Sequence, residues 1–293
     1  MRRIVAELLN MLGARSIDKG KRARGRRFYR LASQIDPRWS TPWYNLALDH
    51  KNCREWEDSL RCNQRATELD PKNEAAWWNQ GIAATALKRW PEARRAWNAY
   101  GIALEDGEGE VRMPGCTACV RLDPGGLGEV VWGIRIDPAR TILLSVPLPE
   151  SGYRFQDIIL NDGAPAGTRV DENGRNVPVF DELAIWQVSS YSTYAVKLRC
   201  PDGEAEKELV KLCGERELGV EDWSTVRFLC AQCSLGNPGP HECSAVPLED
   251  GTRRFGFGAK SREDLTGVLQ QWAGEYSEAE IGEPQMLVSG RPS

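Results

Sequence analysis

The chain has 293 residues, of which 41% are hydrophobic and 27% charged, with a formal net charge of −4. This composition is typical of a folded globular protein of about two domains. It argues against a membrane protein, because no apolar run approaches the roughly 20 residues of a membrane helix, and against a secreted disulfide scaffold, because nine cysteines is an odd number.

Charge is unevenly distributed along the chain. Residues 1–106 contain 20 Lys/Arg and 13 Asp/Glu, a net charge of +7, whereas the remainder contains 18 and 29, a net charge of −11. Seven of the eleven tryptophans also fall in the first part. This contrast indicates separate modules.

The N-terminal segment MRRIVAELLNML has some of the character of a signal peptide. Glu7 and Asn10 interrupt its apolar stretch, and no small-residue cleavage site follows. We therefore expect a folded helix at this position and a cytoplasmic protein with reduced thiols.

The first part contains an internal repeat with a period of 34 residues. Residues 40–73 and 74–107 align without a gap, so that Trp43-Tyr44-Asn45 corresponds to Trp77-Trp78-Asn79. A weaker copy precedes them, with LNMLG at 9–13 and RRFYRLASQIDP at 26–37. This period, with a DP after the first two copies, predicts three antiparallel helix pairs. On these residues, the segment 6–107 resembles the tetratricopeptide repeat (TPR) family.

Small residues at equivalent positions of the three copies, Gly13, Ala47 and Gly81, are expected to let paired helices approach closely while aromatic side chains fill the gaps. The resemblance implies a concave groove that is lined by the first helices and binds peptides or proteins. Its candidate contacts are Tyr44, Asn45, Trp78 and Asn79, although core packing is the alternative for the aromatic residues. Asn10, Ala14 and Ala75 stand where chaperone-binding members carry a basic clamp for a terminal carboxylate, so we do not expect that ligand.

The segment KGKRARGRR at residues 19–27 carries six positive charges in nine positions. It indicates an acidic partner, a nucleic acid, or only a solvated helix face. The nearby aromatic residues are only Phe28 and Tyr29, which disfavours base stacking. We therefore treat Arg26 and Arg27 as candidate contacts to a protein partner.

A β-rich second domain is predicted for residues 107–190. The charged, glycine-rich EDGEGE at 105–110 has the composition of a linker. Beyond it, short β-type runs predict a small sheet or barrel: VVWGIRI at 130–136, TILLSVPL at 141–148, DIILND at 157–162 and LAIWQV at 183–188. Turns are predicted at Asn161-Asp162-Gly163 and Glu172-Asn173-Gly174.

The last part, residues 191–293, has strand-like segments at 192–199, 226–230, 253–259 and 285–289. Two helices separate them. The first is capped by Asp202 and the second, which begins at Ser261, has Asp264 three residues on. The order β-α-β-β-α-β predicts a ferredoxin-like module. The predicted fold class is therefore α+β multidomain, with an all-α TPR domain (1–106), a β-rich domain (107–190) and a ferredoxin-like domain (191–293).

The densest chemistry lies in CAQCSLGNPGPHEC at residues 230–243. Cys230, Cys233, His241 and Cys243 could hold a structural zinc ion, which accepts thiolates and imidazole in a tetrahedral shell. Four protein ligands leave no open position, so such a site would not be catalytic. A variant uses Cys116 and Cys119 as ligands, and the alternative without metal is a buried thiol at Cys230 followed by an irregular loop.

The chain contains only two histidines, His50 and His241, so a catalytic histidine would have to be one of these. No phosphate-binding loop, dinucleotide-binding motif or zinc-protease motif occurs. We therefore expect a non-enzymatic TPR adaptor that binds a protein in its groove or on its acidic C-terminal part. One alternative is a bacterial immunity protein whose acidic part neutralises a basic toxin. Further alternatives are a zinc-dependent enzyme and a nucleic-acid-binding protein.

Overall fold

A computed structural model describes residues 1–126, 128–171, 173–224 and 252–290. The chain divides into two compact units, and each is described by itself. The first contains Met1–Met113 and Asp137–Ala139, and the second contains Pro114–Ile136 and Arg140–Ser293. The finer division into domains 1–106, 107–190 and 191–293 stays a prediction.

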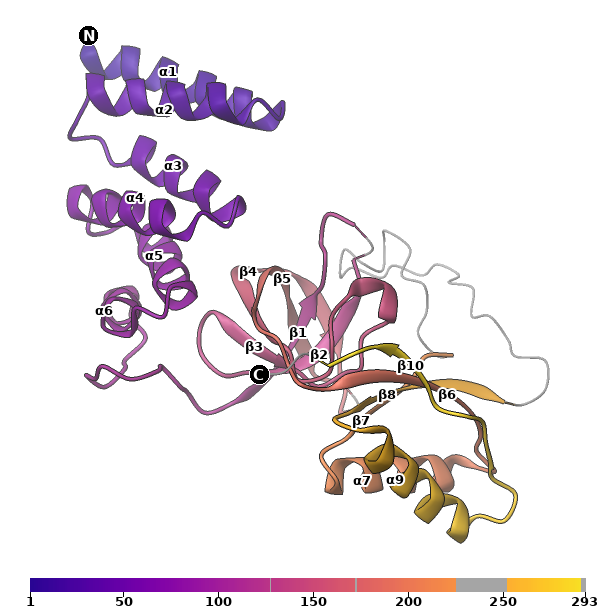
Figure 1. The fold of residues 1–293 in the computed structure, drawn as a ribbon. Coiled ribbons are helices and arrows are strands. Elements are labelled where there is room, and N and C mark those ends of the chain that lie inside the picture. Colours follow the sequence, from indigo (N-terminus) through magenta and orange to yellow (C-terminus); the bar gives the residue numbers. More distant parts are fainter. Residues whose placement is uncertain (127, 172, 225–251, 291–293) are drawn as a thin grey trace. The chain divides into compact units, whose positions relative to one another are not determined.

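The first unit is built from helix pairs (Figure 1). Its helices are α1 (Arg2–Asp18), α2 (Arg22–Ile35), α3 (Thr41–Asn52), α4 (Trp56–Leu69), α5 (Glu74–Ala86) and α6 (Trp90–Tyr100). Within each pair α1/α2, α3/α4 and α5/α6 the helices pack closely, and α2 packs on α3 as α4 packs on α5. The three predicted helix pairs are confirmed.

The turn inside each pair repeats at the 34-residue spacing. One residue of each turn has a left-handed backbone, with φ of 70° at Gly20, 60° at Arg54 and 59° at Lys88. The following N–H donates to a carbonyl five residues back, in the bonds Lys21 N to Ser16 O, Glu55 N to His50 O and Arg89 N to Ala84 O. The sequence repeat is therefore also a repeat of backbone conformation.

Small residues on the first helices face large ones on the second helices. A Cβ atom added at Gly13 would lie 2.6 Å from the Tyr29 ring, and one added at Gly81 would lie 2.5 Å from the Trp97 ring. Both distances are too short for real atoms, so the close approach predicted for these two glycines is confirmed. In the second pair the same positions hold Ala47 and Asn63. Alanine is larger than the glycines of the other two pairs, and asparagine is smaller than Tyr29 and Trp97.

The helical unit ends in a segment that the sequence predicts as a linker. α6 stops at Tyr100, where Gly101 adopts a left-handed φ of 111°. Arg94 on α6 then binds the following chain, because its Nε donates to Glu105 O at 3.1 Å and its Nη1 to Gly109 O at 2.5 Å. These bonds fasten the charged, glycine-rich segment to α6.

The second unit begins with a closed barrel of strands β1 (Cys116–Arg121), β2 (Val130–Arg135), β3 (Arg140–Leu143), β4 (Ile158–Val170) and β5 (Asn176–Gln187). Consecutive strands pair antiparallel, and β1 closes the barrel by pairing parallel with β5. An odd number of strands running alternately up and down brings the first and last strands together in the same direction. The predicted β-rich section is thus a barrel.

Two details of the barrel differ from the sequence prediction. The turn predicted at Asn161-Asp162-Gly163 is wrong, since these residues lie inside β4, where the register with β5 shifts and absorbs them as an irregularity. The predicted strand 141–148 ends at Leu143. The turn that contains Gly174 is confirmed, with Gly174 N donating to Asp171 O at 3.0 Å.

The rest of the second unit is a sheet with two helices. Its elements are β6 (Ser192–Arg199), α7 (Gly203–Glu215), β7 (Gly219–Asp222), β8 (Arg253–Ala259), α9 (Arg262–Glu275), β9 (Glu280–Ile281) and β10 (Gln285–Val288). The order is β10-β6-β8-β7 with antiparallel neighbours, and β9 pairs with β6. β7 is a strand that the sequence analysis missed, and the strand predicted at 226–230 lies outside the described residues.

The apolar residues of α7 and α9 are buried in one core with β6 and β8. Asp202 and Ser261 cap the helices as predicted, accepting hydrogen bonds from Ala205 N at 2.8 Å and Asp264 N at 3.1 Å. Trp223 then links this part to the barrel, because its Nε1 donates to Val146 O at 2.9 Å. The β-barrel and the sheet therefore share buried contacts within one unit.

Candidate functional site

Tyr44 and Asn45, two of the predicted partner contacts, lie half-buried on α3. Asn45 Nδ2 donates a hydrogen bond of 2.9 Å to Asn10 Oδ1 on α1. α1, α3 and α5 also contact one another in this order along the unit. The first helices of the pairs therefore present one shared face, on which Asn10, Tyr44 and Trp78 occupy equivalent positions.

Trp78 and Asn79 occupy the same positions on α5 as Tyr44 and Asn45 on α3. The Trp78 ring packs edge-on against Trp97 and Tyr100 of α6, with ring centroids 5.1 and 4.7 Å apart. Asn79 is only 5% exposed. Trp78 is therefore partly engaged in packing between α5 and α6.

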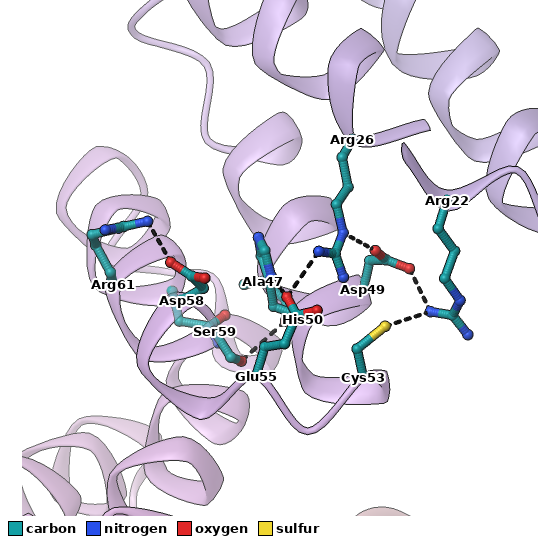
Figure 2. A network of polar contacts seen from close by, with 11 residues as sticks. Arg22, Arg26, Ala47, Asp49, His50, Cys53, Glu55, Asp58, Ser59 and Arg61 are labelled. Atoms are coloured by element: carbon teal, nitrogen blue, oxygen red, sulfur yellow. Dashed lines mark hydrogen bonds and ion pairs between the residues drawn. The ribbon is translucent and has the colours of Figure 1, made fainter. Parts of the chain in front are cut away.

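Arg26 and Arg27, the other two candidates, follow each other on α2 but lie in different surroundings. Arg27 is exposed, whereas Arg26 takes part in an ion-pair network (Figure 2). Arg26 Nε binds Asp49 Oδ2 at 2.5 Å, and Arg22 Nη1 binds Asp49 Oδ1 at 2.7 Å. The Asp49 side chain on α3 is 2% exposed, so two arginines of α2 neutralise a buried charge of α3.

The same network extends to Glu55 in the turn before α4. Arg26 Nη1 binds Glu55 Oε2 at 2.8 Å, and His50 Nδ1 contacts the same oxygen. The hydrogen bonds from Arg26 and His50 lower the pKa of Glu55 below its ordinary value. Burial acts against the charge of Arg26, but the bonds to Asp49 and Glu55 outweigh it and raise the pKa of Arg26. The network therefore holds α2, α3 and the start of α4 together.

His50, Glu55 and Asp58 also bring possible metal-ligand atoms within 4.8 Å of one another. Arg26 and Arg61 already occupy the two carboxylates, the latter binding Asp58 Oδ1 at 2.5 Å. Ion pairs account for this cluster, and we assign no metal to it.

Sequence reasoning missed the role of Asp49. The available signal was the spacing of Arg22 and Arg26, since residues four apart lie on the same helix face and can grip one carboxylate together. The second indication was Asp49 itself, an acidic residue within the apolar pattern of the next helix.

We predict that Asp49→Asn lowers the free energy of unfolding by about 1 to 2 kcal/mol, because it weakens the charge-assisted hydrogen bonds to two partly exposed arginines. Asp58→Asn is the matched control. Asp58 pairs with Arg61 at the surface, where such a pair contributes less than about 1 kcal/mol. Urea denaturation measures both variants, and equal losses would contradict the assignment of Asp49 as the centre of the network.

Cys230, Cys233, His241 and Cys243 lie outside the described residues. Cys116 and Cys119 both lie in β1, where the first is exposed and the second fully buried. Residues three apart on a strand point to opposite faces, so these two thiols do not face a common ion. Burial raises the pKa of Cys119 to about 12, as expected for a packed thiol.

Within the described ranges, no helix combines the length and the apolar character that crossing a membrane requires. No protein-family model matches the chain, and no curated protein matches its sequence.

The chain matches 73 chains of solved structures, and the likeness is weak for the following three. The second TPR of Spaghetti (RPAP3), bound to an HSP90 peptide, is 20% identical and covers 33% of this chain and 91% of its own, with a TM-score of 0.32. The Arabidopsis OM64 TPR domain is 19% identical and covers 35% and 85%, also with a TM-score of 0.32. A hypothetical protein from Neisseria gonorrhoeae is 13% identical and covers 62% and 100%, with a TM-score of 0.23.

Proposed function

We propose that this chain is a non-enzymatic protein-interaction module of the TPR type, which binds a partner protein on the face formed by α1, α3 and α5. The observation that carries the proposal is the 34-residue register. It recurs in the sequence, in the left-handed turns and in the pairs of small and large residues between helices. Stacked helix pairs of this kind present extended surfaces and bury their cores through their neighbours.

We assign the contact with the partner protein to Tyr44 and Asn45. Both are half-buried at the centre of the row of first helices, and an aromatic ring beside an amide suits the recognition of a peptide backbone and its side chains. Tyr44 supplies apolar area, and the Asn10–Asn45 hydrogen bond fixes the amide in place. Arg27 adds an exposed positive charge on α2.

Quantitative affinity purification from the source cell tests this proposal. Tyr44→Ala/Asn45→Ala should reduce recovery of the bound partner by about tenfold, the loss of roughly 1.4 kcal/mol that a contact centre provides. The matched control is Arg61→Ala/Arg65→Ala, two exposed residues of the second helix α4, which should leave recovery unchanged. The proposal fails if both double variants recover the same proteins equally.

For the last part of the chain we propose a ferredoxin-like module. Its support is the strand order β10-β6-β8-β7 with two helices, in the element order expected for that arrangement except for the added two-residue strand β9. This fold hosts many functions and names none. The immunity-protein alternative would use the acidic charge of this part, and reversing that charge should then abolish binding of a basic partner.

We further propose a structural zinc ion for Cys230, Cys233, His241 and Cys243, on their spacing in the sequence alone. The prediction is about one equivalent of zinc in the purified protein, and a lower melting temperature for Cys230→Ser. Elemental analysis decides it, since less than about a tenth of an equivalent removes the zinc site. Cys116→Ser is the control, because this exposed thiol should change neither quantity.

A further inference from the structure

The outer face of α1 is exposed and apolar. Ile4 is 70% exposed, Leu8 52% and Met11 51%, and these residues follow each other at helical spacings of four and three. Exposed apolar side chains scattered singly need no explanation, but a continuous stripe along one helix marks a contact surface. Met1 and Val5 extend the same stripe.

The equivalent face is covered in the next two helix pairs. Leu8 and Arg15 correspond to Pro42 and Asp49 on α3, and to Ala76 and Ala83 on α5. Asp49 is 3% exposed and Ala83 fully buried. α2 packs on α3, and α4 packs on α5, so a helix lies on each later first helix. The open face on α1 therefore has the position of a surface that a helix covers elsewhere in the same unit.

Charges at this face show what kind of helix fits. On the second pair the covered residues are acidic and the covering helix is basic, since Arg26 of α2 binds both Asp49 and Glu55. On the third pair the charges are reversed, so that the covered residue is basic and the covering helix is acidic. Arg89, the equivalent of Glu55, binds Glu57 of the covering helix α4 at 2.8 Å. The covering helix thus supplies the opposite charge in both cases.

On the first pair the same two positions are basic. Asp49 corresponds to Arg15, and Glu55 corresponds to Lys21. Both residues are exposed, and neither forms an ion pair within the described residues. A helix that covers α1 as α2 covers α3 would place its first turn beside these two cations.

We propose that the outer face of α1 binds an amphipathic helix of a partner protein, with carboxylates in its first turn and an apolar stripe behind them. The carboxylates pair with Arg15 and Lys21, and the stripe packs on Ile4, Leu8 and Met11. Acidic residues in a first turn also stabilise the bound helix through its dipole. This surface is separate from the Tyr44 face, and different variants test the two.

A second copy of the chain fits this face poorly. Two α1 helices packed antiparallel bring Arg15 of each to the N-terminal amine and Arg2 of the other, and packed parallel they bring the two Arg15 side chains together. Like charges oppose both arrangements. The chain's own helices with acidic first turns in the second unit, α7 and α9, bury their apolar stripes in their own core.

Two synthetic helices test the proposal against the full chain. Each has 14 residues, the length of α2 and α4, a leucine stripe, and a hydrocarbon staple on the opposite face that keeps it helical. They differ only in the first turn, which carries two glutamates in one and two lysines in the other. Fluorescence anisotropy should show the glutamate peptide binding at least about tenfold more tightly.

Charge reversal in the protein provides the decisive comparison. Arg15→Glu/Lys21→Glu should invert the preference to the lysine peptide, whereas Leu8→Ser should weaken both peptides by about tenfold. All three positions are exposed, so circular dichroism should show unchanged helix content and melting. Equal affinities for the two peptides, no binding at about 1 mM, or an unchanged preference after charge reversal would each overturn the proposal.

Other occupants of the face are distinguished in parallel. Sedimentation velocity of the chain alone reports a dimer, and co-sedimentation with phosphatidylserine vesicles reports membrane binding. The proposal expects a monomer and no vesicle binding that depends on Leu8. A dimer or a vesicle complex that Leu8→Ser abolishes would assign the face to a second copy or to a lipid surface.

Discussion

Gly81→Ala should destabilise the protein by about 3 kcal/mol, although alanine favours helices more than glycine does. The added Cβ would lie 2.5 Å from the Trp97 ring, which is fully buried and cannot swing into solvent. Either α5 moves away from α6 or the indole leaves its position, and both disrupt the packing of the third pair. Chemical denaturation followed by tryptophan fluorescence measures the loss.

The control for this prediction lies on the same helix. Ala75→Gly, at an exposed position in the first turn of α5, measures the intrinsic cost of glycine, at most about 1 kcal/mol. Gly81→Ala would stabilise by that amount if the glycine only weakened the helix. A stabilising effect would show that close packing against Trp97 is not the reason for glycine here.

A double-mutant cycle with Trp97→Leu separates the contact from general damage. Each single change should destabilise the protein, but the smaller leucine makes room for the new methyl group. The double variant should therefore lose less stability than the sum of the two single losses, by about 1 kcal/mol or more. The second pair already shows such a combination, with Ala47 and Asn63 at the same positions.

The stability of the wild-type protein should fall by on the order of 2 kcal/mol between pH 5 and pH 8, and Glu129→Gln should remove most of this fall. Glu129 lies before β2 and accepts a hydrogen bond from Leu148 N at 3.0 Å. Burial raises the pKa of its carboxyl to about 7, and the nearby charges of Glu221 and Glu150 add to the rise. Glutamine keeps the acceptor and carries no charge.

The sign follows from the direction of the shift. Because the folded state holds this proton up to about pH 7, and the unfolded chain releases it near pH 4.5, stability is fully present below pH 4.5 and is lost as pH rises through 7. Burial raises the pKa of Glu221 as well, so its contribution has the same sign. At pH 8 the glutamine variant should therefore be the more stable protein.

Denaturation midpoints at several pH values, compared between wild type and variant, isolate Glu129 from all other titrating groups. The two proteins should have similar stability at pH 5 and diverge toward pH 8. Glu278→Gln, at an exposed carboxyl, serves as the control and should follow the wild type. Parallel curves for wild type and Glu129→Gln would contradict the assignment.

Local chemistry made much of this fold predictable from sequence. The helix pairs repeat at a fixed spacing, and the caps at Asp202 and Ser261 need only residues three positions away. β8 was predicted with its observed ends because RRFGFGA alternates clearly between turn regions. The signals for the caps and for β8 lie within a few residues of the feature, and the helix pairs repeat one local pattern three times.

The features that sequence analysis missed depend on contacts far apart along the chain. Asn161-Asp162-Gly163 has turn composition, but β5 pairs across it and makes it an irregular part of β4. The strand β7 is only four residues long and has little alternation, so its pairing with β8 defines it. Asp49 acquires its role only when α2 lies on α3 and brings Arg22 and Arg26 to it.

The central claim, that the row of first helices holds a partner protein, is tested most directly by photo-crosslinking in the source cell. A benzophenone amino acid replaces Tyr44 in one protein and Arg65, on the second helix α4, in another. We expect a discrete protein adduct from position 44 and none from position 65. Absence of an adduct at 44, or the same adducts from both positions, would contradict it.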